Sequence, residues 1–101
     1  MPETDWVNML KALADSTRLR IVKELLGANM TVNQIGGAIG VSQYNVSKHL
    51  RILRQAGIID GRSIGTHREY FIVEPFRRRL RRAGNTLDLG CCTFRFDQLP
   101  D

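Results

Sequence analysis

The sequence predicts a mainly helical domain of the α+β class, in which helices are followed by a β-hairpin and a C-terminal helix. In the first half of the chain, apolar residues recur at helical spacing, and glycines or capping residues separate the runs. After Gly57 the period changes to short strand-like runs, and Pro75 then suits the first turn of a last helix. With 101 residues and an apolar fraction of 43%, the chain can form one domain with one modest core.

Four helices are expected before the hairpin. The first covers residues 5–14, and the second covers residues 18–26 after the capping residues 15–17. The third covers residues 31–38, and the fourth covers residues 42–56. The apolar residues of the second helix occupy more than one stripe, so we expect this helix to be buried on two sides.

The fourth helix has two sharply different faces. Val46, Leu50 and Leu53 follow the i, i+4, i+7 spacing of a buried face. The opposite face has only hydrogen-bonding and basic side chains and no acidic one: Gln43, Tyr44, Ser47, Lys48, Arg51 and Arg54. Ser42 is a suitable N-cap, and Gly57 suits the left-handed residue that ends a helix. A helix that needs only solubility usually mixes both signs of charge, so this face predicts contact with a polyanion.

A compact turn precedes this helix. Gly40 permits the positive φ of a tight turn, and Gly36 is small enough to let the third and fourth helices cross closely. This arrangement is a helix-turn-helix, whose second helix enters the major groove of DNA. An ordinary helical hairpin in a bundle is the alternative. The basic outer face and the compact turn favour DNA binding.

The segment after the fourth helix predicts a wing. Residues 58–63 and 67–73 are strand-like, and residues 64–66 suggest the turn of a hairpin. Helices followed by one hairpin form the plan of a winged helix. Three of the hairpin's residues suit a flanking phosphate or the minor groove: Arg62, His67 and Arg68. The alternative is that these charges only keep an exposed sheet edge soluble.

The positive charge is concentrated in one segment. The formal net charge of the whole chain is +5. Residues 48–82 carry ten basic and three acidic groups, a net +7, whereas residues 1–47 are neutral and residues 83–101 carry a net −2. A membrane surface would also attract such a segment, but no strongly apolar amphipathic helix accompanies the charge. We therefore expect double-stranded DNA as the partner.

We divide the chain into a DNA-binding domain, residues 1–85, and a tail, residues 86–101. The last helix of the domain covers residues 76–83 and contains five arginines, which serve either phosphate attraction or a solvated surface. Residues 87–96 of the tail alternate like a strand. A chain of this size is not expected to bury alone all of its large apolar groups outside the helix-turn-helix: Trp6, Phe76, Leu80, Phe94 and Phe96. We therefore expect a homodimer formed by the first helix and the tail.

The two cysteines, Cys91 and Cys92, are neighbours in the tail. Neighbouring cysteines rarely form a disulfide with each other, because the geometry is strained. A vicinal thiol pair can bind a thiophilic metal or metalloid such as arsenite, or act as a redox switch. Cysteine is also often simply buried, and the expected strand places Cys92 on one face with Phe94 and Phe96. We favour this structural role.

Two stretches resemble a known family. Ala14–Ile21 reads ADSTRLRI and resembles the ADPTRLRIL opening of the ArsR/SmtB winged-helix repressors. Val41–Ile59 is similar to the SQxxVSxHLxxLxxAGLV block of the same family. The resemblance covers residues 6–73 and implies a dimeric bacterial repressor. Such proteins release operator DNA when an inducer binds, often a metal ion or a thiol oxidant.

The resemblance also implies roles for individual residues. It assigns DNA contacts to five residues that the helical pattern also places on the outer face: Ser42, Gln43, Tyr44, Ser47 and Lys48. His49 lies beside the buried arc, so we expect a packed, hydrogen-bonded histidine there rather than a residue that reads bases. The usual metal sites of the family do not carry over. Residues 28–33 have no thiolate, and residues 76–83 have no Asp or His.

Other classes of protein fit the sequence less well. The acidic start and the lack of a long apolar run predict neither a signal peptide nor a membrane span, so we expect a cytoplasmic protein. We expect no enzyme, because the sequence shows no metal triad, phosphate loop or nucleophile with a paired base. A winged-helix module that binds another protein is the alternative to an operator-binding regulator.

Overall fold

The computed structural model describes residues 3–81, 86–88 and 93–98. Helices form most of the first half, and all strands except β1 lie in the second half. In chain order the elements are α1 (Glu3–Leu13), α2 (Ser16–Gly27), β1 (Met30–Thr31), α3 (Val32–Ile39), α4 (Gln43–Gln55), β2 (Ile59–Ile64), β3 (His67–Ile72), α5 (Glu74–Arg77), β4 (Leu80–Arg81), β5 (Thr86–Asp88), β6 (Thr93–Arg95) and the 3-10 helix η2 (Phe96–Gln98). The predicted order of four helices and a hairpin is confirmed.

Side-chain caps begin three of the four long helices. The carboxylate of Asp15 accepts the backbone N–H of Arg18 at 3.0 Å and begins α2. Thr31 and Gln34 form a reciprocal capping box at the start of α3. The hydroxyl of Ser42 accepts a backbone N–H in the first turn of α4. Each cap satisfies a donor that a helix N-terminus would otherwise leave unpaired.

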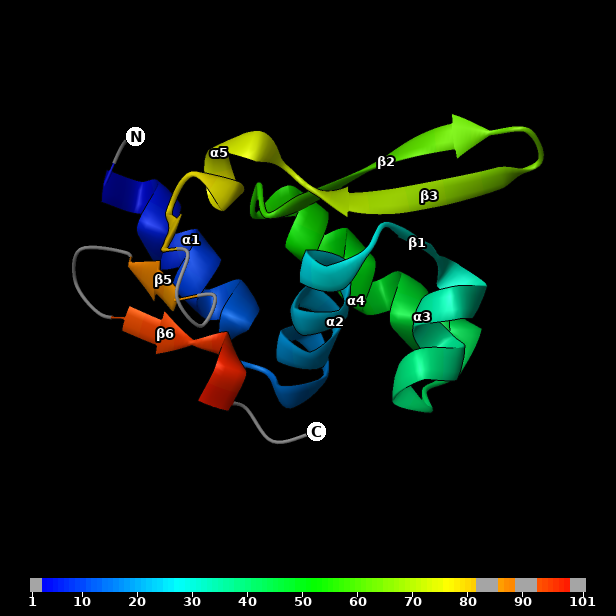
Figure 1. Ribbon diagram of the computed structural model, residues 1–101, viewed down its shortest axis with the longest axis horizontal. Coiled ribbons are helices and arrows are strands. Elements are labelled where there is room, and N and C mark those ends of the chain that lie inside the picture. The colour runs from blue at the N-terminus through cyan, green and yellow to red at the C-terminus, as the bar shows by residue number, and fades with distance from the viewer. Residues whose placement is uncertain (1–2, 82–85, 89–92, 99–101) are drawn as a thin grey trace.

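The core lies between the helices and the sheet. In Figure 1, α2 lies in front of α4, and α1 packs against both helices. Val46, Leu50 and Leu53 of α4 are each at most 1% exposed, which confirms the predicted buried face. Buried apolar residues from α1, α2, α3 and the hairpin, together with Phe76, Leu87 and Phe96, complete this core. Gly36 lies where α3 approaches the turn, because a Cβ there would be 2.8 Å from the carbonyl oxygen of Val41.

The wing is an antiparallel hairpin of β2 and β3, and β1 joins it along the other edge of β3. Ile59 pairs with Ile72 next to the core, and both are buried. At the other end, Ile64 pairs with His67 across the turn, where Gly65 has a φ of +60°. Figure 1 shows this end of the hairpin extending away from the helices. The wing is therefore anchored at one end and exposed at the other.

The expected helix over residues 76–83 is wrong in its length. α5 contains only four residues, Glu74–Arg77, with Pro75 in its first turn as predicted. The chain turns at residues 78–79 and then enters β4, where Leu80 pairs with Leu87. Only Phe76 and Leu80 could form an apolar stripe here, and the second of these is used by a strand instead. A two-residue stripe is too short to stabilise a helix against a competing strand partner.

The tail also differs from the expected single strand over residues 87–96. β4, β5 and β6 form a second antiparallel sheet, and Phe96 lies in η2. Phe76, Leu87 and Phe96 are at most 1% exposed within a single chain. A single chain therefore buries Phe76 and Phe96, whereas the other three large apolar groups named in the prediction stay partly exposed: Trp6, Leu80 and Phe94. Cys91 and Cys92 lie outside the described residues.

Candidate nucleic-acid interface

The outer face of α4 is exposed along its length. All six residues predicted on this face are exposed, and Tyr44 is 73% exposed. The Lys48 ammonium lies 5.5 Å from the centroid of the Tyr44 ring, which favours a cation–π contact between them. Ser42 is exposed as well, although its hydroxyl also caps the helix. The helix therefore presents hydrogen-bonding groups near its N-terminus and cations further along.

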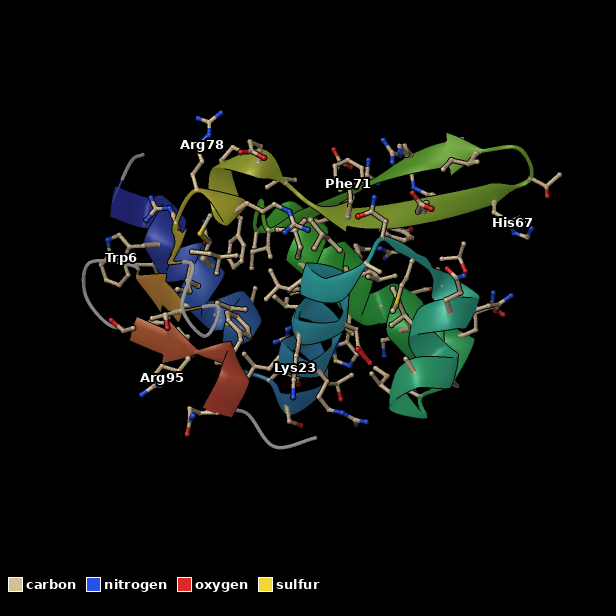
Figure 2. The ribbon with its side chains drawn as sticks, in the orientation of Figure 1. Trp6, Lys23, His67, Phe71, Arg78 and Arg95 are labelled. Atoms are coloured by element: carbon tan, nitrogen blue, oxygen red, sulfur yellow. The ribbon has the colours of Figure 1, made fainter. Side chains whose placement is uncertain are left out.

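The wing presents the three residues predicted there, Arg62, His67 and Arg68, all of them exposed. His67 lies at the outer end of β3 (Figure 2), where it lines a groove with residues of α3 and α4. Arg62 forms an ion pair with Glu69 on the facing strand, at 3.3 Å. Part of the charge of Arg62 is therefore compensated.

Arg68 is positioned by its neighbours on the wing. Its guanidinium donates to the carbonyl oxygen of Gly61 at 3.2 Å and lies 5.9 Å from the centroid of the Tyr70 ring. No carboxylate is paired with Arg68 in the described part of the chain. Its charge is therefore held in place and available to an anion.

Two grooves bring the wing and α4 together. The larger has a volume of about 620 Å³ and is lined by Ser47, Leu50, Arg51, Arg54, Gln55, Arg68 and Tyr70. The smaller, of about 190 Å³, is lined by Thr31, Val32, Asn33, Gln43, Thr66, His67 and Arg68. Arg68 borders both grooves. Predicted site residues that are far apart in the sequence thus surround one continuous region.

Sequence reasoning missed several residues of these grooves. Gln55 lies four residues after Arg51, so the helical period could have placed it on the same face. Tyr70 lies two residues after Arg68, and the period of a strand could have placed it beside that arginine. Asn33 had no comparable signal, because α3 meets the wing only in the folded chain.

An acidic residue lies at the edge of the larger groove. The carboxylate of Asp60 accepts the N–H of Gly61 at 2.8 Å and pairs with Arg54 at 3.0 Å. The backbone N–H of Gly61 is the main cause that lowers the pKa of Asp60, and Arg54 lowers it further. Asp60 is therefore ionised at neutral pH and compensates Arg54. The charge of Arg68 also lowers the pKa of Asp60, although no ion pair joins the two. Arg51 forms no ion pair within the described residues.

His49 does not belong to this surface. Its Nδ1 lies 3.2 Å from the guanidinium of Arg18, and its side chain is 23% exposed. The prediction of a packed, hydrogen-bonded histidine is confirmed. Among the described residues, there is also no group of three or more His, Cys, Asp or Glu side chains that could hold a metal ion.

Comparison with known proteins identifies the family of this fold. The family model for bacterial regulatory proteins of the arsR family matches residues 15–60. The chain is 32% identical over 98 residues to the probable mercury resistance operon repressor of Streptomyces lividans, which covers 91% of this chain and 78% of that protein. The chain belongs to the ArsR family. The resemblance seen in the sequence is thereby confirmed, and this ArsR-family protein is a DNA-binding transcriptional regulator.

Two further similarities support the assignment. The chain is 40% identical over 52 residues to the transcriptional repressor SdpR of Bacillus subtilis, covering 52% of this chain and 58% of SdpR. The homodimeric winged helix-turn-helix domain of Mb0332 from Mycobacterium bovis superposes with a TM-score of 0.66 at 30% identity. That match covers 68% of this chain and 64% of the Mb0332 fragment.

These similarities also bear on the other classes of protein considered from the sequence, such as enzymes. The chain spans 78% of the Streptomyces protein but only 58% of SdpR. Each of the three relatives is named as a repressor or a DNA-binding regulator, and none is named as an enzyme. In the described part of this ArsR-family protein, no helix is long and apolar enough to cross a membrane.

Proposed function

We propose that this protein is a cytoplasmic repressor that binds operator DNA as a homodimer, with α4 in the major groove and the wing on the flanking backbone. The observation that carries the proposal is the shared region of α4 and the wing. Arg51 and Arg68, from these two elements, line one groove with Ser47, and no acid lies on the outer face of α4. A protein-interaction module has no need for so one-sided a surface.

The proposal gives the residues of α4 two kinds of role. The N-terminal residues of a recognition helix reach the base edges, so Gln43, Tyr44 and Ser47 are assigned to base reading. Lys48 and Arg51 lie further along the helix and are assigned to phosphates. Ser42 caps α4, and its hydroxyl proton is still available to a phosphate oxygen.

The wing supplies the flanking contacts. Arg62, His67 and Arg68 are assigned to phosphates or to the minor groove beside the major-groove site. Arg68 is the strongest of the three, because it borders both grooves and forms no ion pair with a carboxylate within the described residues. Arg62 is expected to contribute less, since it is paired with Glu69.

The small size of the DNA-contacting helix α4 predicts a dimer. One α4 contacts only a few base pairs, and two-fold dimers place two such helices about one helical turn of DNA apart. The Mb0332 domain is homodimeric, and the Streptomyces and Bacillus relatives are named as repressors. These similarities support a repressor that reads two half-sites.

The first test is the salt dependence of DNA binding. Sequences selected from random DNA should bind with an affinity that falls steeply with salt, because each neutralised phosphate releases about 0.9 counterion. Lys48→Ala and Arg68→Ala should each flatten this slope by about one unit. Lys23→Ala, a charge change on α2, is the matched control and should leave the slope unchanged. A flat salt dependence of the unmodified protein would contradict operator binding and favour the protein-interaction alternative.

The second test separates reading from positioning. Gln43→Ala and Ser47→Ala should change the preferred sequence, at a cost of roughly 1–3 kcal/mol at one base pair each. Ser63→Ala, an exposed serine of the wing, is the control for losing a hydroxyl. Equal weakening on every DNA sequence would show that Gln43 and Ser47 only position α4.

For the inducer, we propose the adjacent thiols of Cys91 and Cys92 as the candidate site for a thiophilic metal, a metalloid or an oxidant. One observation supports testing it: the Streptomyces relative is named for mercury resistance. Hg²⁺, arsenite or mild peroxide should release DNA from the unmodified protein but not from Cys91→Ser/Cys92→Ser. An unchanged affinity with all three reagents would leave the cysteines a structural role.

A further inference from the structure

A polar cluster joins the start of α2 to the recognition helix α4. It consists of Asp15, which caps α2, Arg18 in the first turn of α2, and His49 on α4. The guanidinium of Arg18 lies 3.2 Å from Nδ1 of His49 and 3.9 Å from the carboxylate of Asp15. The same carboxylate lies 3.9 Å from Nδ1 of His49. Residues 31 positions apart in the chain are thus brought into one contact.

Arg18 also holds the end of α1. Its Nε donates to the carbonyl oxygen of Ala12 at 2.5 Å, and a terminal nitrogen lies 3.5 Å from the carbonyl oxygen of Lys11. These carbonyls belong to the last turn of α1, where backbone acceptors have no partner within the helix. One side chain therefore links three helices. It is only 14% exposed, so its hydrogen bonds are little weakened by competing water.

The protonation states in this cluster follow from its donors. A guanidinium can only donate, so Nδ1 of His49 is the acceptor in this contact. The backbone N–H of Arg18 is the main cause that lowers the pKa of Asp15, and the charge of Arg18 lowers it further. Asp15 is therefore ionised at neutral pH and compensates the charge of Arg18.

We infer that Arg18 and His49 are positioning residues for DNA recognition, which hold α4 at the rotation and depth that its base contacts require. This inference rests on the proposed function. His49 directly follows Lys48 and lies two residues after Ser47, so a shift of the helix at His49 moves both of the neighbouring contacts. Arg18 also binds the backbone of α1 at Ala12 and Lys11. The position of α4 is therefore fixed relative to a helix outside the helix-turn-helix.

The two classes of DNA contact respond differently to a small shift of α4. Base contacts are short, directional hydrogen bonds, which weaken steeply when their geometry changes. Phosphate contacts from long lysine and arginine side chains tolerate a shift, because these side chains adjust and the attraction acts over several ångströms. Loss of the cluster should therefore reduce selectivity while leaving general DNA affinity and its salt dependence nearly unchanged.

The experiment compares the full-length protein with Arg18→Ala, His49→Ala and the double variant. Affinity is measured for the selected operator and for unrelated DNA of equal length, at the same series of salt concentrations and below the melting temperature of every variant. Each single variant should lose about tenfold in operator affinity, the change that corresponds to one good hydrogen bond. Affinity for unrelated DNA and the salt slope should stay the same. The double variant should lose no more than either single one, because both substitutions break the same link.

Two further variants separate positioning from general stability. His49→Asn keeps an acceptor near the place of Nδ1 and should recover most of the lost selectivity. Arg20→Ala removes an arginine from the same helix, together with its bond to the Ile39 carbonyl oxygen at 2.7 Å, but no bond to α4. It should keep the ratio of operator to unrelated affinity. An equal loss of selectivity in Arg20→Ala would overturn the inference, because any loosening of α2 would then suffice.

The outcomes distinguish this inference from the proposed function. If the unmodified protein does not prefer its selected sequence over unrelated DNA, the proposed function is wrong. If it does prefer that sequence, and Arg18→Ala and His49→Ala prefer it equally, only the role of the cluster is wrong. Should Arg18→Ala fail to fold, the comparison of His49→Ala with His49→Asn still decides, because His49 is the only member of the cluster on α4.

Discussion

The chain has two strongly basic segments, and they take different structures. α4 keeps its helix over thirteen residues, Gln43–Gln55, and its exposed cations lie on one face beside the wing. The arginine run that begins at Arg77 leaves the helix at once, because α5 covers only Glu74–Arg77. Arg78 points away from the molecule in Figure 2 and pairs with Glu74 at 3.7 Å.

The difference comes from the apolar residues and caps, since both segments are rich in charge. α4 has three fully buried residues at helical spacing and a serine that caps its first turn. α5 has one buried residue, Phe76, and its N-cap residue, Val73, makes no side-chain hydrogen bond. A run of arginines therefore does not specify a helix. A buried stripe and a cap do, and they also decide on which face the charges lie.

The largest effect on stability should come from truncating Phe76, the one buried residue of α5 in the second basic segment. Phe76 is fully buried, so Phe76→Ala should lower the free energy of unfolding by about 3–5 kcal/mol, measured by urea denaturation. Leu50→Ala in α4 is the matched variant, with an expected loss of about 2–5 kcal/mol. A loss below 1 kcal/mol for Phe76→Ala would show that this segment is not anchored to the core at all.

The next effect concerns the turn that places α4. At Gly36 a Cβ would be 2.8 Å from the backbone oxygen of Val41, so Gly36→Ala should cost about 1–3 kcal/mol through a forced shift of the turn. Gly37 is helical and has no atom within 4 Å of such a Cβ. Gly37→Ala should therefore stabilise the protein, by about 0.5–1 kcal/mol. Thermal unfolding of the two variants measures both signs, and equal effects would disprove the close approach at Gly36.

A smaller effect should come from the cap that α4 has and α5 lacks. Ser42→Ala removes the acceptor of the Asn45 N–H and should cost about 1 kcal/mol of stability. Ser63→Ala on the exposed wing is the control, with an expected change within about 0.5 kcal/mol. If both serines gave the same small change in urea denaturation, the cap would not explain why α4 persists and α5 stops.

The smallest effect on folding, and the most informative for function, should come from the exposed cations. Lys48→Ala/Arg51→Ala and Arg77→Ala/Arg78→Ala each remove two positive charges from exposed positions. The first pair should flatten the salt dependence of operator binding by about two units, and the second pair should change it by less than about half a unit. Equal flattening would assign the arginine run to the DNA as well.

Local patterns in the sequence were enough to predict the helices that carry the interface. The buried arc of α4, the caps at Asp15, Thr31 and Ser42, and the glycine turn of the wing are all encoded within a few residues of each other. Helical period, capping and turn chemistry act over such short distances, and therefore they can be read without knowing the fold.

Contacts between distant parts of the chain decided the rest. Strand β5 withdraws Leu80 from the expected last helix, Arg68 comes beside Ser47 and Arg51, and Arg18 reaches His49 across 31 positions. Pairing between remote strands and side chains leaves no periodic signal in the sequence. Each such pair depends on two distant positions and not on a pattern that repeats along one segment. Only the packing of α2 against α4 and of the wing over α4 brings those atoms within reach of each other.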